Sequence, residues 1–78
     1  MKRVIVISTS LHILFSEIYF LIALRMAKAT ELLKMTSLSI AEVGAEVGYP
    51  DQLHFSRAFK NVYGVSPRAW RKQNSKLV

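Results

Sequence analysis

A group of polar and charged side chains in the C-terminal third of the sequence has the chemistry needed to read duplex DNA. Arg57 carries a guanidinium fork that matches the two acceptors of guanine in the major groove, and Gln52 can pair bidentately with adenine. Ser56 can bond to a donor or an acceptor, and Leu53 can touch a thymine methyl group. The candidate DNA-binding residues are Gln52, Leu53, His54, Ser56, Arg57, Lys60, Arg68 and Arg71.

Some of these residues have other interpretations that stay open at this point. Arg57 can instead form an intrahelical or interhelical ion pair, and Leu53 can be an exposed hydrophobe with no thymine near it. His54 can be a surface residue without a contact, a ligand of a phosphate or base edge, or part of the core. The aromatic pair Phe55 and Phe59, four residues apart, predicts core packing and not a stacking platform for single-stranded nucleic acid.

These side chains need a helix that brings them to one face. Asp51 can accept hydrogen bonds from backbone N–H groups two or three residues on, which predicts a helix from about Gln52 to about Val62. At roughly 100° per residue, one side of this helix carries Phe55, Ala58, Phe59 and Val62. The opposite side carries Leu53, Ser56, Arg57 and Lys60. The major groove is wide enough to admit a helix, and an outward face with these side chains could then reach the base edges.

A shorter helix is predicted just before it. Ser39 and Glu42 form a capping-box pattern, so this helix starts near residue 40. Its apolar face consists of Ile40, Val43 and Val47. Ala41 and Ala45 are small enough for close approach of another helix. Gly48 suits the left-handed backbone position that ends a helix, so the two helices are joined by a tight glycine turn, as in a helix-turn-helix.

A third short helix is predicted after the second glycine turn. Gly64 can end the preceding helix, and Ser66 followed by Pro67 is a cap with proline at the first helical position. This helix extends to about Gln73, with Trp70 as its anchor in the core. Its cations, which we expect nearer the surface and close to phosphates, are Arg68, Arg71 and Lys72.

The charge distribution agrees with a nucleic-acid partner. The 78 residues carry a formal net charge of +6, and no acidic residue occurs from His54 onward. The cations of that stretch are Arg57, Lys60, Arg68, Arg71, Lys72 and Lys76. A solvated basic tail is the plain alternative. The sequence contains no cysteine, which excludes disulfides and thiolate metal sites and is compatible with the cytoplasm, where we expect the protein.

Residues 1–24 suggest a different class of function. After Lys2 and Arg3 comes an apolar stretch about as long as a bilayer is thick, which can be a signal sequence or membrane anchor. His12 and Glu17 argue against insertion, because an acidic group near mid-bilayer costs roughly 2.5–3.5 kcal/mol. The stretch can also be the remnant of a lost half-domain, or a strand and helix that pair with another chain. Its exposed apolar residues would then favour self-association.

Catalysis finds no support in the sequence. The two histidines, His12 and His54, have no nucleophile or paired carboxylate at a suitable spacing. The acidic residues interpreted as caps or solvated surface residues are Glu31, Glu42, Glu46 and Asp51. No glycine-rich phosphate loop or metal-ligand cluster occurs, so we expect no enzyme activity, no cofactor, no metal and no small-molecule ligand in this chain.

Several spaced motifs together resemble one known family. They are Arg25, Ala29, Leu32 and Leu33 on one helix, then Ser39-Ile40, Val47-Gly48-Tyr49, Phe55-Ser56-Arg57-Ala58-Phe59-Lys60, Gly64-Val65-Ser66-Pro67 and Trp70-Arg71. The stretch from about Leu24 to Arg71 is similar to the C-terminal part of the DNA-binding domain of AraC/XylS-type transcription regulators. The resemblance implies an all-α, homeodomain-like fold and a bacterial regulator. Its recognition helix would enter the major groove through Gln52, Leu53, Ser56 and Arg57.

The sequence also departs from that family. The resemblance implies two helix-turn-helix units joined by a linker helix, but only the linker helix, from about Leu24 to Met35, and the second unit are legible. We therefore expect residues 1–23 to be an apolar remnant or anchor and residues 24–78 to be the DNA-binding domain. The expected partner is double-stranded DNA. RNA polymerase and self-association through residues 1–24 are further possibilities, and the alternative function is a membrane-associated or protein-interaction fragment acting through that segment.

Overall fold

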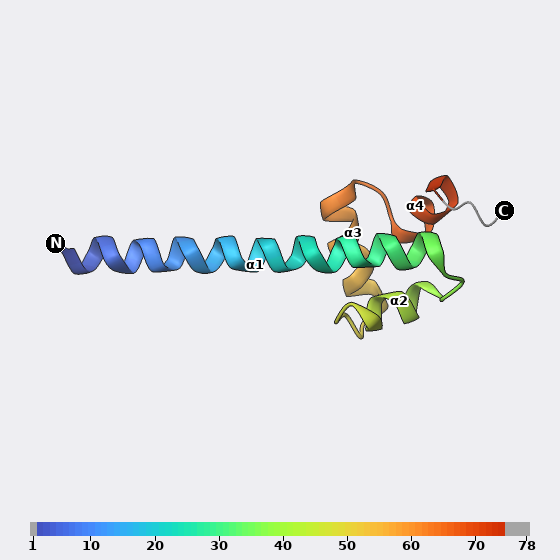
Figure 1. Ribbon diagram of the computed structural model, residues 1–78, viewed down its shortest axis with the longest axis horizontal. Coiled ribbons are helices and arrows are strands. Elements are labelled where there is room, and N and C mark those ends of the chain that lie inside the picture. Colours follow the sequence, from blue (N-terminus) through green and yellow to red (C-terminus); the bar gives the residue numbers. More distant parts are fainter. Residues whose placement is uncertain (1, 75–78) are drawn as a thin grey trace.

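The computed structural model describes the backbone of residues 2–74 and the side chains of residues 16–74. Within this part of the chain all regular structure is helical: α1 is Lys2–Met35, α2 is Ile40–Glu46, α3 is Gln52–Tyr63 and α4 is Pro67–Asn74. The three short helices pack around the C-terminal part of α1, while its N-terminal part projects away from them (Figure 1). The all-α prediction is confirmed.

Helix α1 is longer than the predicted linker helix. It ends at Met35 as expected, but it begins at Lys2 and not near Leu24. The predicted division of the chain at residue 24 thus falls inside a continuous helix. No glycine or proline occurs in residues 1–24, so nothing in the backbone stops the helix from continuing toward the N-terminus. The alternative that this segment contains a strand is therefore wrong.

Expectations for some side chains lie outside the described residues. They concern the cations Lys2 and Arg3, the imidazole of His12, the apolar side chains before Ser16, and Lys76. Within the described part of the chain, no helix combines the length and the apolarity needed to cross a bilayer.

Helix α2 begins with the predicted capping box. The Ser39 hydroxyl accepts a hydrogen bond from the Glu42 N–H at 3.1 Å, and the Glu42 carboxylate accepts one from the Ser39 N–H at 3.0 Å. The Ser39 N–H bonded to the carboxylate, together with the Ser39 hydroxyl, lowers the pKa of Glu42 below its usual value. Because the folded-state pKa is lowered, the stabilisation is present above the unfolded-state pKa and is lost as the pH falls through the folded-state value. Gly48, at φ 95°, then takes the left-handed position that the sequence predicts.

The ends of α3 and α4 follow the predicted local chemistry. The Asp51 carboxylate accepts hydrogen bonds from the N–H groups of Leu53 and His54, at 2.9 and 3.2 Å. Gly64, at φ 80°, ends α3 in the left-handed conformation. The Ser66 hydroxyl accepts a hydrogen bond from the Ala69 N–H at 3.1 Å and thereby caps α4. Each helix is one residue longer than predicted, ending at Tyr63 and Asn74.

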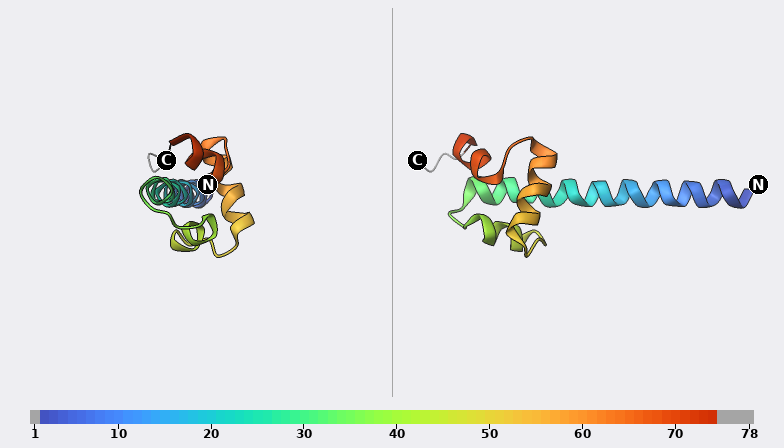
Figure 2. Two further views of the ribbon diagram at one scale, coloured as in Figure 1. Left: turned by 90° about the vertical axis from the view of Figure 1, so that its right-hand side faces the viewer. Right: turned by 180° about the vertical axis from the view of Figure 1, so that it is seen from behind.

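One core holds the four helices together. A view along α1 shows α2, α3 and α4 grouped around one side of it (Figure 2). The buried residues of this core are Met26, Ala29, Leu33, Val43, Val47, Tyr49, Phe55 and Phe59. Trp70 is partly buried and meets the Phe59 ring edge-on, with 6.3 Å between the centroids, as expected for an anchor. Val62 was placed on the apolar side but is 44% exposed, because the neighbouring helices cover α3 mainly along the Phe55–Phe59 line.

The close approach between α2 and α3 occurs at a glycine. Ala41 and Ala45, predicted to allow this approach, are exposed, whereas Gly44 is buried. A Cβ atom built on Gly44 would lie only 2.9–3.0 Å from carbons of Phe55. The absence of a side chain at residue 44 therefore lets Phe55 reach its place in the core.

Replacing this glycine should destabilise the protein. In Gly44→Ala we expect a net loss of about 1 kcal/mol in the free energy of unfolding, because overpacking costs about 1–3 kcal/mol and exceeds the gain in helix propensity of up to about 1 kcal/mol. Urea unfolding followed by circular dichroism measures the effect. Ala45→Ser, at the exposed neighbouring position, is the control and should change stability by less than about 0.5 kcal/mol. If the urea midpoint of Gly44→Ala is equal to or above that of the wild type, the close packing of Phe55 against Gly44 is contradicted.

Candidate nucleic-acid interface

The outward face of α3 lies opposite its buried aromatic residues. Phe55 and Phe59 are fully buried, whereas Leu53 is 59% exposed and Arg57 is also exposed. Gln52 and Lys60 are exposed on this helix, and Ser56 is half-buried. The rotation of α3 thus places the predicted base-reading side chains toward solvent.

Arg57 is free for an external partner in this structure. Among the residues whose side chains are described, one ion pair occurs, between Lys28 Nζ and Glu31 Oε2 at 3.3 Å. Helix α3 itself carries no acidic residue, and no carboxylate of the other described residues forms an ion pair with the Arg57 guanidinium. The intramolecular ion pair considered from the sequence is therefore absent from the described residues.

His54 lies on the edge of this face and has an aromatic neighbour. Its ring meets the Tyr49 ring edge-on, with centroids 5.1 Å apart and planes at 79°. The side chain is nevertheless exposed, so it remains accessible to a phosphate or a base edge. Its backbone N–H is already bonded to the Asp51 carboxylate, so any external contact must use the imidazole.

The two candidate arginines of α4 lie in different surroundings. Arg68 is exposed, as is Lys72. Arg71 is half-buried, and its Nε donates a hydrogen bond to the Leu33 carbonyl oxygen at 3.0 Å, with Nη2 near the Thr36 carbonyl oxygen at 3.5 Å. A cation at this place also matches the negative end of the α1 dipole. Arg71 thus differs from the expected surface position, because it binds the C-terminal end of α1.

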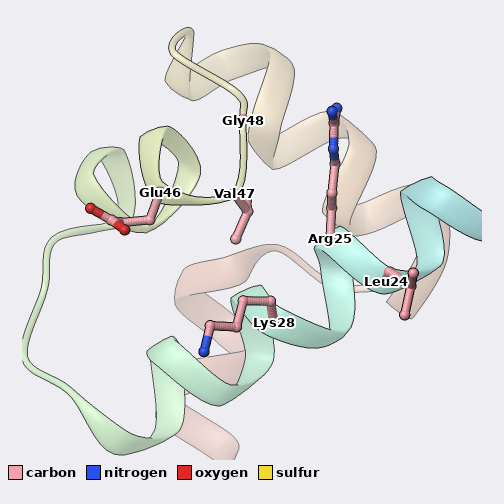
Figure 3. Close-up of a pocket in the computed structure, with 6 residues that line it drawn as sticks. All are labelled: Leu24, Arg25, Lys28, Glu46, Val47 and Gly48. Carbon is pink, nitrogen blue, oxygen red and sulfur yellow. The ribbon is translucent and has the colours of Figure 1, made fainter.

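A second arginine outside the predicted set also contacts a helix-turn-helix residue. The Arg25 guanidinium carbon lies 5.9 Å from the centre of the Tyr49 ring. Figure 3 shows Arg25 on α1 beside the segment that contains Gly48, in a shallow pocket lined also by Leu24, Lys28, Glu46 and Val47. In the sequence, Arg25 and Tyr49 both belong to the motifs that resemble the known family, which is the one sign that they matter. The spacing of these motifs does not reveal that the two side chains are in contact.

Helices α3 and α4 are basic, although the exposed Asp51 carboxylate caps the start of α3. The exposed cations on α3 and α4 are Arg57, Lys60, Arg68 and Lys72, and neither of these helices carries an acidic residue. The exposed carboxylates Glu42 and Glu46 lie on α2. Within the described residues, no three metal-ligating side chains come together. The exposed cations of α3 and α4 can form hydrogen bonds and attract anions such as phosphates.

Comparisons with known proteins agree with this arrangement. A family model described as "Helix-turn-helix domain" matches residues 11–73. The Msm operon regulatory protein of Streptococcus mutans is 44% identical over 54 residues, which are 69% of this chain and 19% of that protein. The arabinose operon regulatory protein of Escherichia coli is 49% identical over 47 residues, 60% of this chain and 16% of that protein. The chain thus spans less than a quarter of each of these relatives.

Solved structures show the same fold. The C-terminal domain of AraT, a response regulator from Geobacillus stearothermophilus, superposes with a TM-score of 0.74 at 43% identity, covering 78% of this chain and 52% of that one. The C-terminal domain of the response regulator yesN from Fusobacterium nucleatum gives a TM-score of 0.69 at 33% identity, covering 82% and 68%.

The position of Arg71 predicts a role in stability. In Arg71→Ala we expect the free energy of unfolding to fall by about 1.5–3 kcal/mol, because a charged hydrogen bond to the end of α1 is lost. Arg68→Ala, on the same helix but exposed, should change it by less than about 0.5 kcal/mol. Thermal or urea unfolding of the two variants compares them directly. Equal stability of both variants would show that the contact from Arg71 to α1 contributes nothing to the fold.

Proposed function

The chain belongs to the AraC/XylS family of helix-turn-helix regulators, whose function is DNA-binding transcription regulation, and we propose that α3 is the helix that enters the major groove. The observation that carries this proposal is the orientation of α3. Both phenyl rings on its inner side have no exposed surface, while Arg57 on the outer side is exposed. A helix oriented in this way can lie in the groove without disturbing the core.

The side chains of this interface have two roles in this proposal. Arg57 pairs with guanine, Gln52 with adenine, Ser56 with a neighbouring base edge, and Leu53 contacts a thymine methyl group. The phosphate-binding side chains are Lys60 on α3 and Arg68 on α4, with His54 at the edge of the interface. Arg71 contributes indirectly in this proposal, because its hydrogen bond to α1 fixes α4, the helix that carries Arg68.

Binding should depend strongly on salt. Each phosphate neutralised by a lysine or arginine releases counterions, so the affinity falls with rising salt concentration. One helix-turn-helix reads only a few base pairs, and useful affinity therefore needs a second unit on the same DNA. We place this activity in the bacterial cytoplasm, where such a regulator meets its DNA.

A second copy of the chain can supply the further unit. On α1 the exposed apolar side chains are Ile18, Tyr19, Phe20, Leu21 and Leu24, at 48–72% exposure. Because consecutive residues of a helix point in different directions, these side chains leave apolar surface on several sides of α1 at this level, and exposed apolar surface of this extent is typical of a protein–protein interface. We therefore propose self-association through the N-terminal part of α1.

The role of Arg57 can be tested by comparing two kinds of DNA. On a duplex selected by the wild-type protein, Arg57→Ala should bind more weakly by roughly 1–3 kcal/mol, while its binding to random DNA changes little. Lys60→Ala is the control, because loss of a phosphate contact weakens both duplexes alike. Fluorescence anisotropy titrations measure all four affinities. An equal loss on both duplexes in Arg57→Ala would refute base readout by this residue.

Self-association can be tested by sedimentation equilibrium over a range of concentrations. The wild-type weight-average mass should rise with concentration, and Tyr19→Glu should shift the protein toward monomer, because a charge is placed in the apolar contact. Ala27→Glu adds the same charge to an exposed position of the same helix and serves as the control. A wild-type protein that stays monomeric, or a Tyr19→Glu variant that associates as strongly, would exclude this interface.

A further inference from the structure

A cation–π contact followed by contacts between aromatic rings connects α1 to the first turn of α3. It begins at Arg25, whose guanidinium carbon lies 5.9 Å from the centre of the Tyr49 ring. Tyr49 then meets the ring of His54, with centroids 5.1 Å apart, and the ring of Phe55, at 6.1 Å. Arg25 and His54 are exposed, whereas Tyr49 is only 8% exposed. These contacts join α1 to the turn before α3 and to the first turn of α3, which lie more than twenty residues after Arg25 in the chain.

The Arg25 guanidinium lies against the turn that contains Gly48. Gly48 has a φ of 95°, and a Cβ atom on it would lie 3.4 Å from the guanidinium carbon of Arg25. This distance is an ordinary van der Waals contact, so glycine is required here by its left-handed backbone, and the distance shows how closely the guanidinium approaches the turn. Figure 3 shows Arg25 extended beside this segment.

Tyr49 is also fixed from α2. Its N–H donates a hydrogen bond to the Gly44 carbonyl oxygen at 2.7 Å. Asp51, which caps α3, follows two residues later, so the placement of Tyr49 determines where α3 begins. Through Tyr49, Arg25 therefore acts on the end of α3 that carries Gln52, Leu53 and His54.

We propose that Arg25 is a positioning residue for base recognition, which acts through Tyr49 on the N-terminal turn of α3 without touching DNA itself. This inference rests on the proposed function of α3. A planar guanidinium over an aromatic ring differs from a lysine ammonium in geometry as well as in hydration, so lysine is not an equivalent replacement here. Lys28, one turn further along α1, carries the same charge but pairs with Glu31 and provides a matched control.

The variants R25Q, R25K and K28Q of the full chain test the proposal. On a duplex selected by the wild type, R25Q should bind roughly 2- to 5-fold more weakly, the change that an exposed cation–π contact can supply. R25K should recover only part of this loss, and K28Q should bind like the wild type. Binding of R25Q to random DNA should be unchanged.

Salt dependence separates positioning from a direct phosphate contact. If Arg25 only positions α3, the slope of log affinity against log salt is the same for R25Q and wild type; a phosphate contact would lower its magnitude by about 0.9. In NMR spectra recorded without DNA, the amide signals of His54 and Phe55 should shift in R25Q more than in K28Q.

Each outcome has a distinct meaning. A reduced salt slope in R25Q, an affinity equal to that of the wild type, or unchanged amide signals would overturn the positioning role while leaving DNA binding by α3 intact. Failure of the wild type itself to select any duplex would overturn the proposed function together with this inference. Unfolding curves of all three variants show whether a loss of affinity reflects loss of the fold.

Discussion

The burial of two phenyl rings on one side of α3 is the constraint on which the rest of the structure depends. Phe55 fits only because Gly44 on α2 has no side chain, and Phe59 is covered with help from Trp70 on α4. With both rings held, α3 cannot rotate about its axis. The side chains on its opposite face, Arg57 among them, must then point to solvent, where a DNA groove can meet them.

The C-terminal part of α1 acts as the frame for this arrangement. Its buried residues Met26, Ala29 and Leu33 contribute to the core, and two arginines connect it to the helices around it. Arg71 reaches from α4 to the carbonyl groups at the end of α1, and Arg25 reaches from α1 to the turn before α3. Charged side chains thus serve two separate purposes: some join the helices, and others remain exposed for a partner.

Features that depend on neighbouring residues were predictable from the sequence. The capping box at Ser39, the cap at Asp51 and the left-handed glycines follow from interactions within one turn, so the helix limits around them are confirmed. Contacts between distant segments were not predictable in this way. The roles of Gly44 and Arg71 require the relative placement of two helices, and nothing in one sequence specifies it. The predicted start of α1 near Leu24 was wrong. The apolar residues before Leu24 contain no signal that stops a helix, but an apolar stretch of this kind is also compatible with other structures.

An NMR structure of the protein in complex with a selected duplex tests the central claim most directly. Intermolecular NOEs between the outward side chains of α3 and major-groove protons, with the resonances of Phe55 and Phe59 unperturbed, are the predicted result. NOEs that instead connect the duplex to the acidic surface of α2, or spectra in which the two phenyl rings leave the core on binding, would contradict the account.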